Sequence, residues 1–368
     1  MKRTDQLTFT RFLAAITVVV FHYGDKAYPF TIPPLDQLVP TGHIFVSYFF
    51  ALSGFIMAMV YFRPANNIQP IKYWIYRFAR IYPVYLLGLL LTMFFNPKMW
   101  QDILAVRLNL TLLQSWWPPY PMTLNYPGWS LSVEAFFYIL FPILLWLSYR
   151  MSLKLNAWLV GLFWLGSLLG HTYLMNTVYV SGNAFYHDLL FYNPLVHLNT
   201  FLVGCLGGRW WVETGHKHIP NAWQNRAILL FSTILIGLAL LYLKDLPKTL
   251  GFPIRITLPN GVLAPLFLVF IVSLAYENGL ISKIFRLPFF VLLGDASYSV
   301  YILQYPAHIF YKKYLLPLIP NPTDTSGFYL YFLALILFSI LIFKLIEYPI
   351  RDLAKQLYQR SPMAKRGW

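Results

Sequence analysis

The chain has 368 residues, of which 58% are hydrophobic and only 11% charged, and its formal net charge is +15. Soluble domains carry about 25% charged residues, so this composition excludes a soluble globular protein and indicates a polytopic membrane protein. The basic residues stand in short clusters between apolar runs, which argues for membrane topology and against a nucleic-acid partner. The single cysteine, Cys205, excludes an internal disulfide and a cysteine-based metal cluster, and no metal ligand is expected.

Apolar stretches of spanning length predict ten transmembrane helices. An even number of spans puts both termini on one side, and lysine and arginine are more frequent in the segments that would then be cytoplasmic. We therefore expect an all-α membrane bundle with cytoplasmic termini, a transmembrane domain over 1–345 and a basic cytoplasmic tail over 346–368. The predicted spans are 7–23, 43–62, 81–95, 129–148, 155–170, 189–211, 227–243, 259–276, 289–311 and 328–345.

The stretch 96–128 is only partly apolar, is rich in aromatic residues and is interrupted by prolines. Because tryptophan and tyrosine favour the depth of the lipid headgroups, we expect a re-entrant or interfacial helix followed by an outer loop. An eleventh span is the alternative.

The first span carries Arg11 and His22. At 100° per residue the eleven positions between them come to about three turns plus 20°, so both side chains lie on one helix face, about 16 Å apart. Ionisable residues within a membrane segment are costly and indicate a functional site. The alternative is that both side chains snorkel to the two membrane surfaces.

Glu134 stands about one turn into the fourth span, which starts on the outer side, so it is expected at a depth similar to that of His22. A carboxylate partner fixes the tautomer of a histidine and raises its basicity, and such a pair can deprotonate a hydroxyl. The alternatives are a purely structural contact, or two residues on different faces that never meet. Four further histidines, His171, His187, His197 and His308, have no acid or metal partner at helical spacing and are expected to be satisfied polar residues.

Two further stretches place polar residues in or beside apolar spans. Ser53 and Gly54 in the second span predict close helix approach, with a narrow channel beside the first helix as the alternative. Arg77 and Arg80, at i and i+3 on one helix face, suit the oxygens of a polyphosphate. The alternative for the arginine pair is topology and lipid headgroup contact.

The ninth span begins with a cluster of hydroxyls and one acid, over 293–301. Polar groups there must find partners within the bundle, so they form either a ligand-lined groove or hydrogen bonds between helices.

Taken together, these blocks resemble the acyltransferase-3 family of integral-membrane bacterial O-acyltransferases, which modify sugars and some antibiotics. The resemblance covers almost the whole chain, in family order. Many relatives carry a histidine where this chain has Gln304, which argues against proton transfer at that position and leaves His22 as the histidine candidate. The matching blocks are Arg11-X10-His22, FFALSGF at 49–55, RFARIYP at 77–83, PGWSLSVEAFFYILFP at 127–142, FLVG at 201–204, LGDASYSVYILQYP at 293–306 and IEYP at 346–349.

The resemblance implies transfer of an acyl group, most often acetyl, from cytoplasmic acyl-CoA to a hydroxyl of a carbohydrate or lipid-linked glycan. A sugar of a surface or exopolysaccharide precursor is the expected acceptor, and the bacterial inner membrane the expected location. Because many relatives add a periplasmic esterase-like domain, this chain is expected to be the stand-alone form; no oligomeric state is predicted. The implied residues are His22 and Glu134 for catalysis, Arg11, Ser53, Arg77 and Arg80 for acetyl-CoA, and Trp129, Ser130, Ser297, Tyr298 and Tyr301 for the acceptor.

A different class of function is also compatible with the residues. In a proton-coupled transporter or flippase for a glycolipid or small solute, Arg11, His22 and Glu134 would form a proton relay. Such a protein is expected to show an inverted repeat of its first five spans, and no repeat is visible in this sequence. Within the acyltransferase reading, direct transfer with His22 as general base is favoured over an acyl-histidine intermediate, which would predict ping-pong kinetics.

Overall fold

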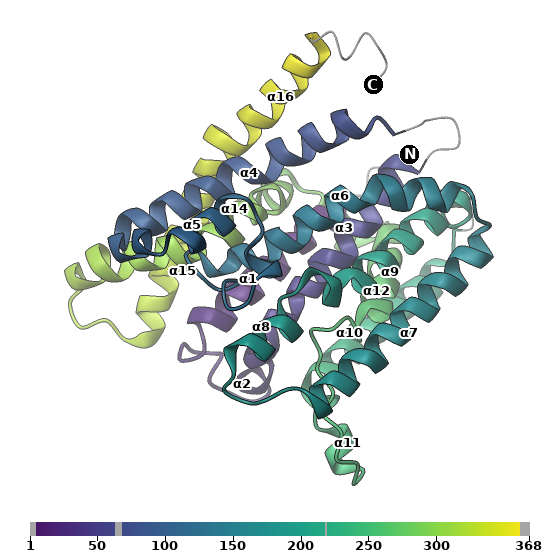
Figure 1. Cartoon of the computed structure of the whole chain (residues 1–368), viewed down its shortest axis with the longest axis horizontal. Helices are drawn as coiled ribbons and strands as arrows, with labels where there is room; N and C mark the ends of the chain where they lie inside the picture. The colour runs from purple at the N-terminus through teal and green to yellow at the C-terminus, as the bar shows by residue number, and fades with distance from the viewer. Residues whose placement is uncertain (1–4, 63–67, 218, 361–368) are drawn as a thin grey trace.

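The computed structural model describes residues 5–62, 68–217 and 219–360, and this part of the chain is helical, without strands. The helices form one bundle in which α1 runs through the centre (Figure 1). A helix corresponds to each predicted span. These are α1 (Asp5–Tyr23), α3 (Phe45–Tyr61), α4 (Pro70–Phe95), α6 (Trp129–Tyr149), α7 (Leu153–Thr177), α9 (Pro194–Glu213), α10 (Ala222–Tyr242), α12 (Ala264–Tyr276), α14 (Pro288–Phe310) and α15 (Asp324–Ile342).

In the described residues, 8 helical segments are long and apolar enough to cross a membrane. α12 has only 13 residues, since its predicted first turn is replaced by a loop around Gly261, which has a φ of 89°. α14 is long enough at 23 residues, but its hydropathy is lower because hydroxyl groups and Gln304 lie on its buried face. α4 begins eleven residues before its predicted start, so Arg77 and Arg80 lie within the helix.

The stretch between α4 and α6 holds α5 (Ile103–Leu110) and three short 3-10 turns. Eight residues of α-helix are about 12 Å long, well short of the roughly 30 Å hydrocarbon core. An eleventh span is therefore excluded, and a short helix followed by a loop is what forms. The loop is held against the bundle by buried polar side chains: Tyr85 donates to the Asn109 carbonyl at 2.8 Å and Gln114 donates to the Gly128 carbonyl at 2.9 Å.

The start of α1 and the end of α16 (Tyr348–Arg360) lie on the same side of the bundle (Figure 1). α15 continues into α16 through one π-helical turn over Phe343–Glu347, so the helix passes through the predicted boundary at 345 without a break. α16 packs beside α4, where the rings of Tyr76 and Tyr358 are 5.9 Å apart.

Glycines set the distance between two pairs of helices. A Cβ on Gly204 of α9 would lie 2.1 Å from the Ala51 carbonyl oxygen of α3, and one on Gly54 of α3 would lie 2.3 Å from the Phe201 carbonyl oxygen. The close approach predicted at Gly54 is thus confirmed. α14 meets α1 in the same way, since a Cβ on Gly294 would lie 2.3 Å from the Thr8 carbonyl oxygen.

Replacing Gly204 by alanine should destabilise the protein, because the new methyl group meets backbone that cannot move aside. We expect the free energy of unfolding to fall by about 1–3 kcal/mol, measured by thermal unfolding in detergent. Gly161→Ala on α7 is the matched control, since nothing lies within 4 Å of its added Cβ. Equal stability of the two variants would contradict the tight contact between α3 and α9.

Candidate active site

A polar cavity of about 100 Å³ lies where α1, α3, α4, α6 and α14 meet. Its wall contains all the residues implied for catalysis and for donor or acceptor binding except His22 and Trp129. The tertiary structure therefore brings together side chains from five helices that are far apart in the chain. The members from that set are Arg11, Ser53, Arg77, Arg80, Ser130, Glu134, Ser297, Tyr298 and Tyr301.

Arg77 is held by aromatic rings. Its guanidinium carbon lies 5.5 Å from the ring centres of Tyr61 and Tyr73 and 5.6 Å from that of Tyr138. Its buried Nε has no hydrogen-bond partner among the described residues. Rings attract a cation without neutralising it, so Arg77 keeps its full positive charge beside the cavity.

Glu134 lies among the arginines. Its carboxylate accepts hydrogen bonds from Ser53 Oγ at 3.3 Å and from the hydroxyl of Tyr138. Over the described part of the chain, however, no carboxylate comes within 4.0 Å of Arg11, Arg77 or Arg80. The cavity thus carries three arginines and one glutamate that are close but not paired.

A second buried carboxylate, that of Glu347, accepts from Ser299 Oγ at 3.0 Å and feels the charges of Arg80 and Arg11. Unpaired charge in a low-dielectric interior is unfavourable, so an arginine-lined cavity of this kind favours an anionic ligand.

His22 does not pair with Glu134, and that prediction is wrong. His22 Nδ1 lies 2.8 Å from Gln304 Oε1 on α14. The two residues do not share a depth. Glu134 lines the cavity together with Arg11, about 16 Å along α1 from His22, and α14 covers the face on which His22 stands. Glu134 turns instead toward Ser53 on α3 and Tyr138 on its own helix.

The amide of Gln304 is oriented by its second hydrogen bond. Its Nε2 donates to the Tyr301 carbonyl at 2.7 Å, and therefore its Oε1 faces the histidine. An amide oxygen only accepts, so His22 Nδ1 carries the proton and Nε2 holds the free lone pair. The neutral ring is thus poised to accept a proton through Nε2. Although Gln304 cannot transfer a proton, it determines which nitrogen of His22 can.

Trp129 lies outside the cavity wall, toward α8 (Ala184–Phe191). Its ring is 5.0 Å from that of Tyr192, 5.2 Å from that of His197 and 6.2 Å from that of Phe50, which does line the cavity. It therefore connects the cavity to an aromatic and polar region at the start of α9.

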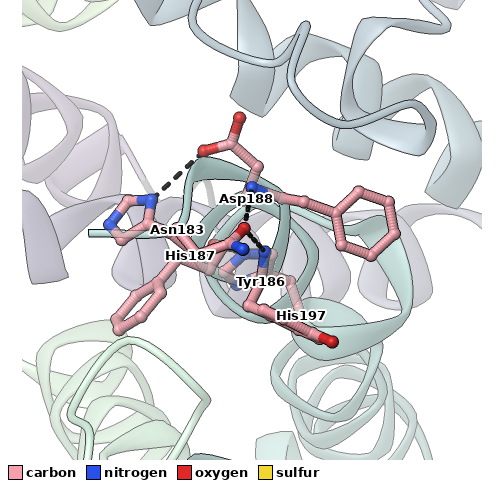
Figure 2. A network of polar contacts seen from close by, with 7 residues as sticks. Asn183, Tyr186, His187, Asp188 and His197 are labelled. Carbon is pink, nitrogen blue, oxygen red and sulfur yellow. Dashed lines mark hydrogen bonds and ion pairs between the residues drawn. The ribbon is translucent and has the colours of Figure 1, made fainter. Parts of the chain in front are cut away.

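Figure 2 shows the polar contacts around α8. The Asn183 side chain caps the helix by accepting from the Phe185 and Tyr186 amides, and His187 Nδ1 lies 3.1 Å from Asp188 Oδ1. His187 thus has an acid partner, but it is the next residue and not one at helical spacing.

The other histidines have different contacts. His171 and His197 each donate to a backbone carbonyl, that of Leu190 and that of Phe191, both at 2.9 Å. His308 instead packs on the ring of Tyr23 at 4.0 Å between centroids.

Sequence reasoning missed two groups of functional neighbours. The tyrosines around Arg77 could have been found in part, because Tyr73 and Tyr138 stand four residues from Arg77 and from Glu134 on their own helices. The contact between His22 and Gln304 joins α1 to α14, and no local spacing indicates it.

Comparison with known proteins identifies the chain's relatives. The family described as "Acyltransferase domain" (Acyl_transf_3) matches residues 5–344. A Staphylococcus aureus (strain COL) protein, named only provisionally as an O-acetyltransferase, is 23% identical over 95% of this chain. The chain spans 58% of the length of that relative.

Two further relatives carry more specific names. Acyltransferase MdmB of Streptomyces mycarofaciens is 33% identical over 42% of this chain and 41% of its own length. Peptidoglycan O-acetyltransferase OatA of Listeria monocytogenes (serovar 1/2a) is 25% identical over 80% of this chain and 48% of its own length. No solved structure matches the chain significantly.

The unpaired arginines predict that inorganic pyrophosphate stabilises the protein. At about 100 times its dissociation constant, the ligand should raise the free energy of unfolding by about 2.7 kcal/mol, measured as a shift in thermal unfolding. Arg80→Met should remove most of this shift, whereas Arg107→Met on exposed α5 should retain it. A shift of the same size in both variants would show that pyrophosphate binds elsewhere.

Proposed function

The chain belongs to the acyltransferase-3 family, and on this premise we propose that it is a membrane O-acyltransferase. It moves an acyl group, expected to be acetyl, from acyl-CoA to a hydroxyl of a sugar in a surface or exopolysaccharide precursor. The observation that carries this proposal is the cavity lined by Arg11 of α1 and by Arg77 and Arg80 of α4, with His22 on the same face of α1 as Arg11. The end of this face that carries Arg11 suits the binding of phosphates, and the end that carries His22 suits proton transfer.

The donor half of the proposal rests on the arginine-lined cavity. Acyl-CoA carries several phosphate oxygens, and arginine forks bind such oxygens bidentately. Arg77, held by its three tyrosines, together with Arg80 and Arg11 supplies these donors. The pantetheine arm then runs past Ser53 and along the face of α1 toward His22.

The acceptor half rests on His22. Its free Nε2 accepts the proton of the acceptor hydroxyl, whose oxygen attacks the carbonyl carbon of the thioester. The carbon–sulfur bond then breaks, and the proton held by His22 passes to the leaving sulfur. The products are an O-acyl ester and free CoA, without a covalent intermediate on the enzyme.

The geometry gives Glu134 a role different from the expected one. It does not orient His22; its carboxylate instead holds Ser53 and Tyr138 and faces the arginines of the cavity. We therefore assign to Glu134 the positioning of the donor site. Gln304 takes the part of orienting the histidine.

Residues proposed for the acceptor fall into two groups. The hydroxyls of Ser130 and Ser297 donate to the carbonyls of Pro127 and Gly294, at 3.0 and 2.6 Å. Their oxygen lone pairs therefore stay free to accept hydrogen bonds from a ligand in the cavity. Tyr298 and Tyr301 line the same cavity, so these four residues lie at the arginine end of the α1 face, and we assign them to the donor rather than to the acceptor at His22. Trp129 supports a sugar ring from outside the cavity, since flat aromatic faces suit the apolar faces of sugars. The bacterial inner membrane, with both termini cytoplasmic, is the proposed location.

The experiment that tests the function uses membranes made leaky to small molecules, radiolabelled acetyl-CoA and a lipid-linked glycan extract. Wild type should move label into an alkali-labile ester, and His22→Ala should lower this rate by about 10²–10⁴-fold through loss of the general base. His216→Ala, which replaces a histidine bonded to the Trp211 carbonyl, is the control.

Each outcome of this experiment separates two functions. A transporter or flippase would consume no acetyl-CoA in leaky membranes, so the absence of ester with acetyl and longer donors would contradict the transferase. Equal rates in wild type and His22→Ala would leave the transferase standing and remove His22 from its mechanism.

Gln304 offers a separate test of the tautomer. Gln304→Leu keeps the size of the side chain but removes the oxygen that His22 Nδ1 bonds. We expect kcat to fall by about tenfold or more, because the ring loses its orientation, while KM for acetyl-CoA stays unchanged. A rise in KM with kcat unchanged would argue that Gln304 serves donor binding instead.

A further inference from the structure

A second cavity, of about 500 Å³, lies on the opposite side of α1 from the arginine cavity. On α1 it is lined by Leu13, Thr17 and Val20, among others. Leu13 and Val20 point about 180–200° away from Arg11 at 100° per residue. The remaining wall comes from α3, α10, α12 and the outer segment that includes α2 (Leu35–Leu38) and the 3-10 helix over Val39–Ile44. The two cavities share no lining residue.

The second cavity is chemically a hydrocarbon space. Its wall carries five hydroxyls and no acidic, basic, histidine or amide side chain. Every one of these hydroxyls is already hydrogen-bonded. Thr17, Thr41 and Thr233 donate to backbone carbonyls of their own segments at 2.7–2.9 Å, Thr10 donates to the Leu7 carbonyl at 2.8 Å, and Tyr48 pairs with Thr10 at 2.6 Å.

Water is therefore a poor occupant, because a buried water needs two to four polar partners and finds no free donor here. An empty space of this size is also unfavourable, because the lining atoms lose their dispersion contacts. A flexible hydrocarbon chain satisfies both conditions, and the volume falls within the range of about 300–1,000 Å³ typical of ligand pockets.

The cavity opens sideways. Leu13, which lines the cavity, is 38% exposed, whereas every other residue of α1 is buried or half-buried, and we therefore infer that the cavity opens beside Leu13. It stands in the middle of a membrane-spanning helix, at the depth of the lipid hydrocarbon. The opening beside Leu13 therefore faces lipid tails, not water.

We propose that the second cavity binds a hydrocarbon tail of a bilayer phospholipid, which enters beside Leu13 and lies along α1. The tail supports from behind the helix that carries Arg11 and His22. The donor's acyl chain is excluded as the occupant by the separation of the two cavities, since α1 stands between them.

The test uses phosphatidylcholine vesicles that contain the protein and a phosphatidylcholine with a diazirine near the end of one acyl chain. After irradiation, mass spectrometry should locate adducts on the α1 segment 13–20 and on Phe270 of α12. Gly237→Phe fills the cavity, and nothing lies within 4 Å of its added Cβ, so the helix tolerates the change. These adducts should be lost in Gly237→Phe.

Gly166→Phe on α7 is the matched control, because its Cβ also meets nothing within 4 Å and it lines neither cavity. It should keep the adducts. Leu13→Trp, which places a larger side chain at the opening, should reduce them and serves as the second variant. Monodisperse elution of all three variants in detergent checks that they fold.

Several outcomes would overturn the proposal. Adducts on α1 that persist in both Gly237→Phe and Leu13→Trp would show that the tails do not enter the cavity. Stronger labelling at the same positions by a diazirine-bearing long-chain acyl-CoA or prenyl phosphate would assign the cavity to the donor or to the acceptor instead. Because the readout is labelling, the result does not depend on whether the protein is an acyltransferase.

Discussion

The arrangement of this protein depends on three arginines placed inside a membrane bundle, none of which contacts a carboxylate of the residues that the structure describes. A charged side chain inside a membrane is energetically costly. The bundle lowers this cost through nearby rings and carboxylates that do not form direct ion pairs with the arginines. Tyrosine rings surround Arg77, and Glu134 and Glu347 act on the arginines from nearby positions while bonding to Ser53, Tyr138 and Ser299. A direct salt bridge would satisfy the arginines and leave nothing to bind a ligand. The cavity can therefore bind a ligand because its arginines are not paired with carboxylates.

Close helix packing makes this cavity possible. Gly54 and Gly204 bring α3 onto α9, and Gly294 brings α14 onto α1, at distances that exclude a Cβ. The second contact aligns α14 with α1 along their length. As a result, Tyr298 and Tyr301 reach the arginine cavity, while Gln304 reaches His22. The same helix thus contributes to the binding end and the proton-transfer end of one face of α1.

α1 has a different environment on each side. One face carries Arg11 and His22 toward polar partners, and the other lines an apolar space without a free hydroxyl. α1 thus lies between a charged cavity and an apolar one. Contacts on both faces would fix the position of this helix, which keeps Arg11 and His22 about 16 Å apart. The proposed transferase and the proposed lipid tail make use of opposite faces of this single element.

The sequence by itself determined the helical membrane architecture, because apolar runs of spanning length allow few other structures in a bilayer. It also identified nine of the residues that line the arginine cavity, since charged and hydroxyl groups are conspicuous within apolar helices. Only the tertiary structure decided the partners. Glu134 and His22 were expected at a similar depth, yet Glu134 lies beside Arg11, about three helical turns along α1 from His22. Spacing within one helix does not determine how helices are offset along one another. The packing of distant segments does, and it places His22 against Gln304 and Glu134 against Ser53 and Tyr138.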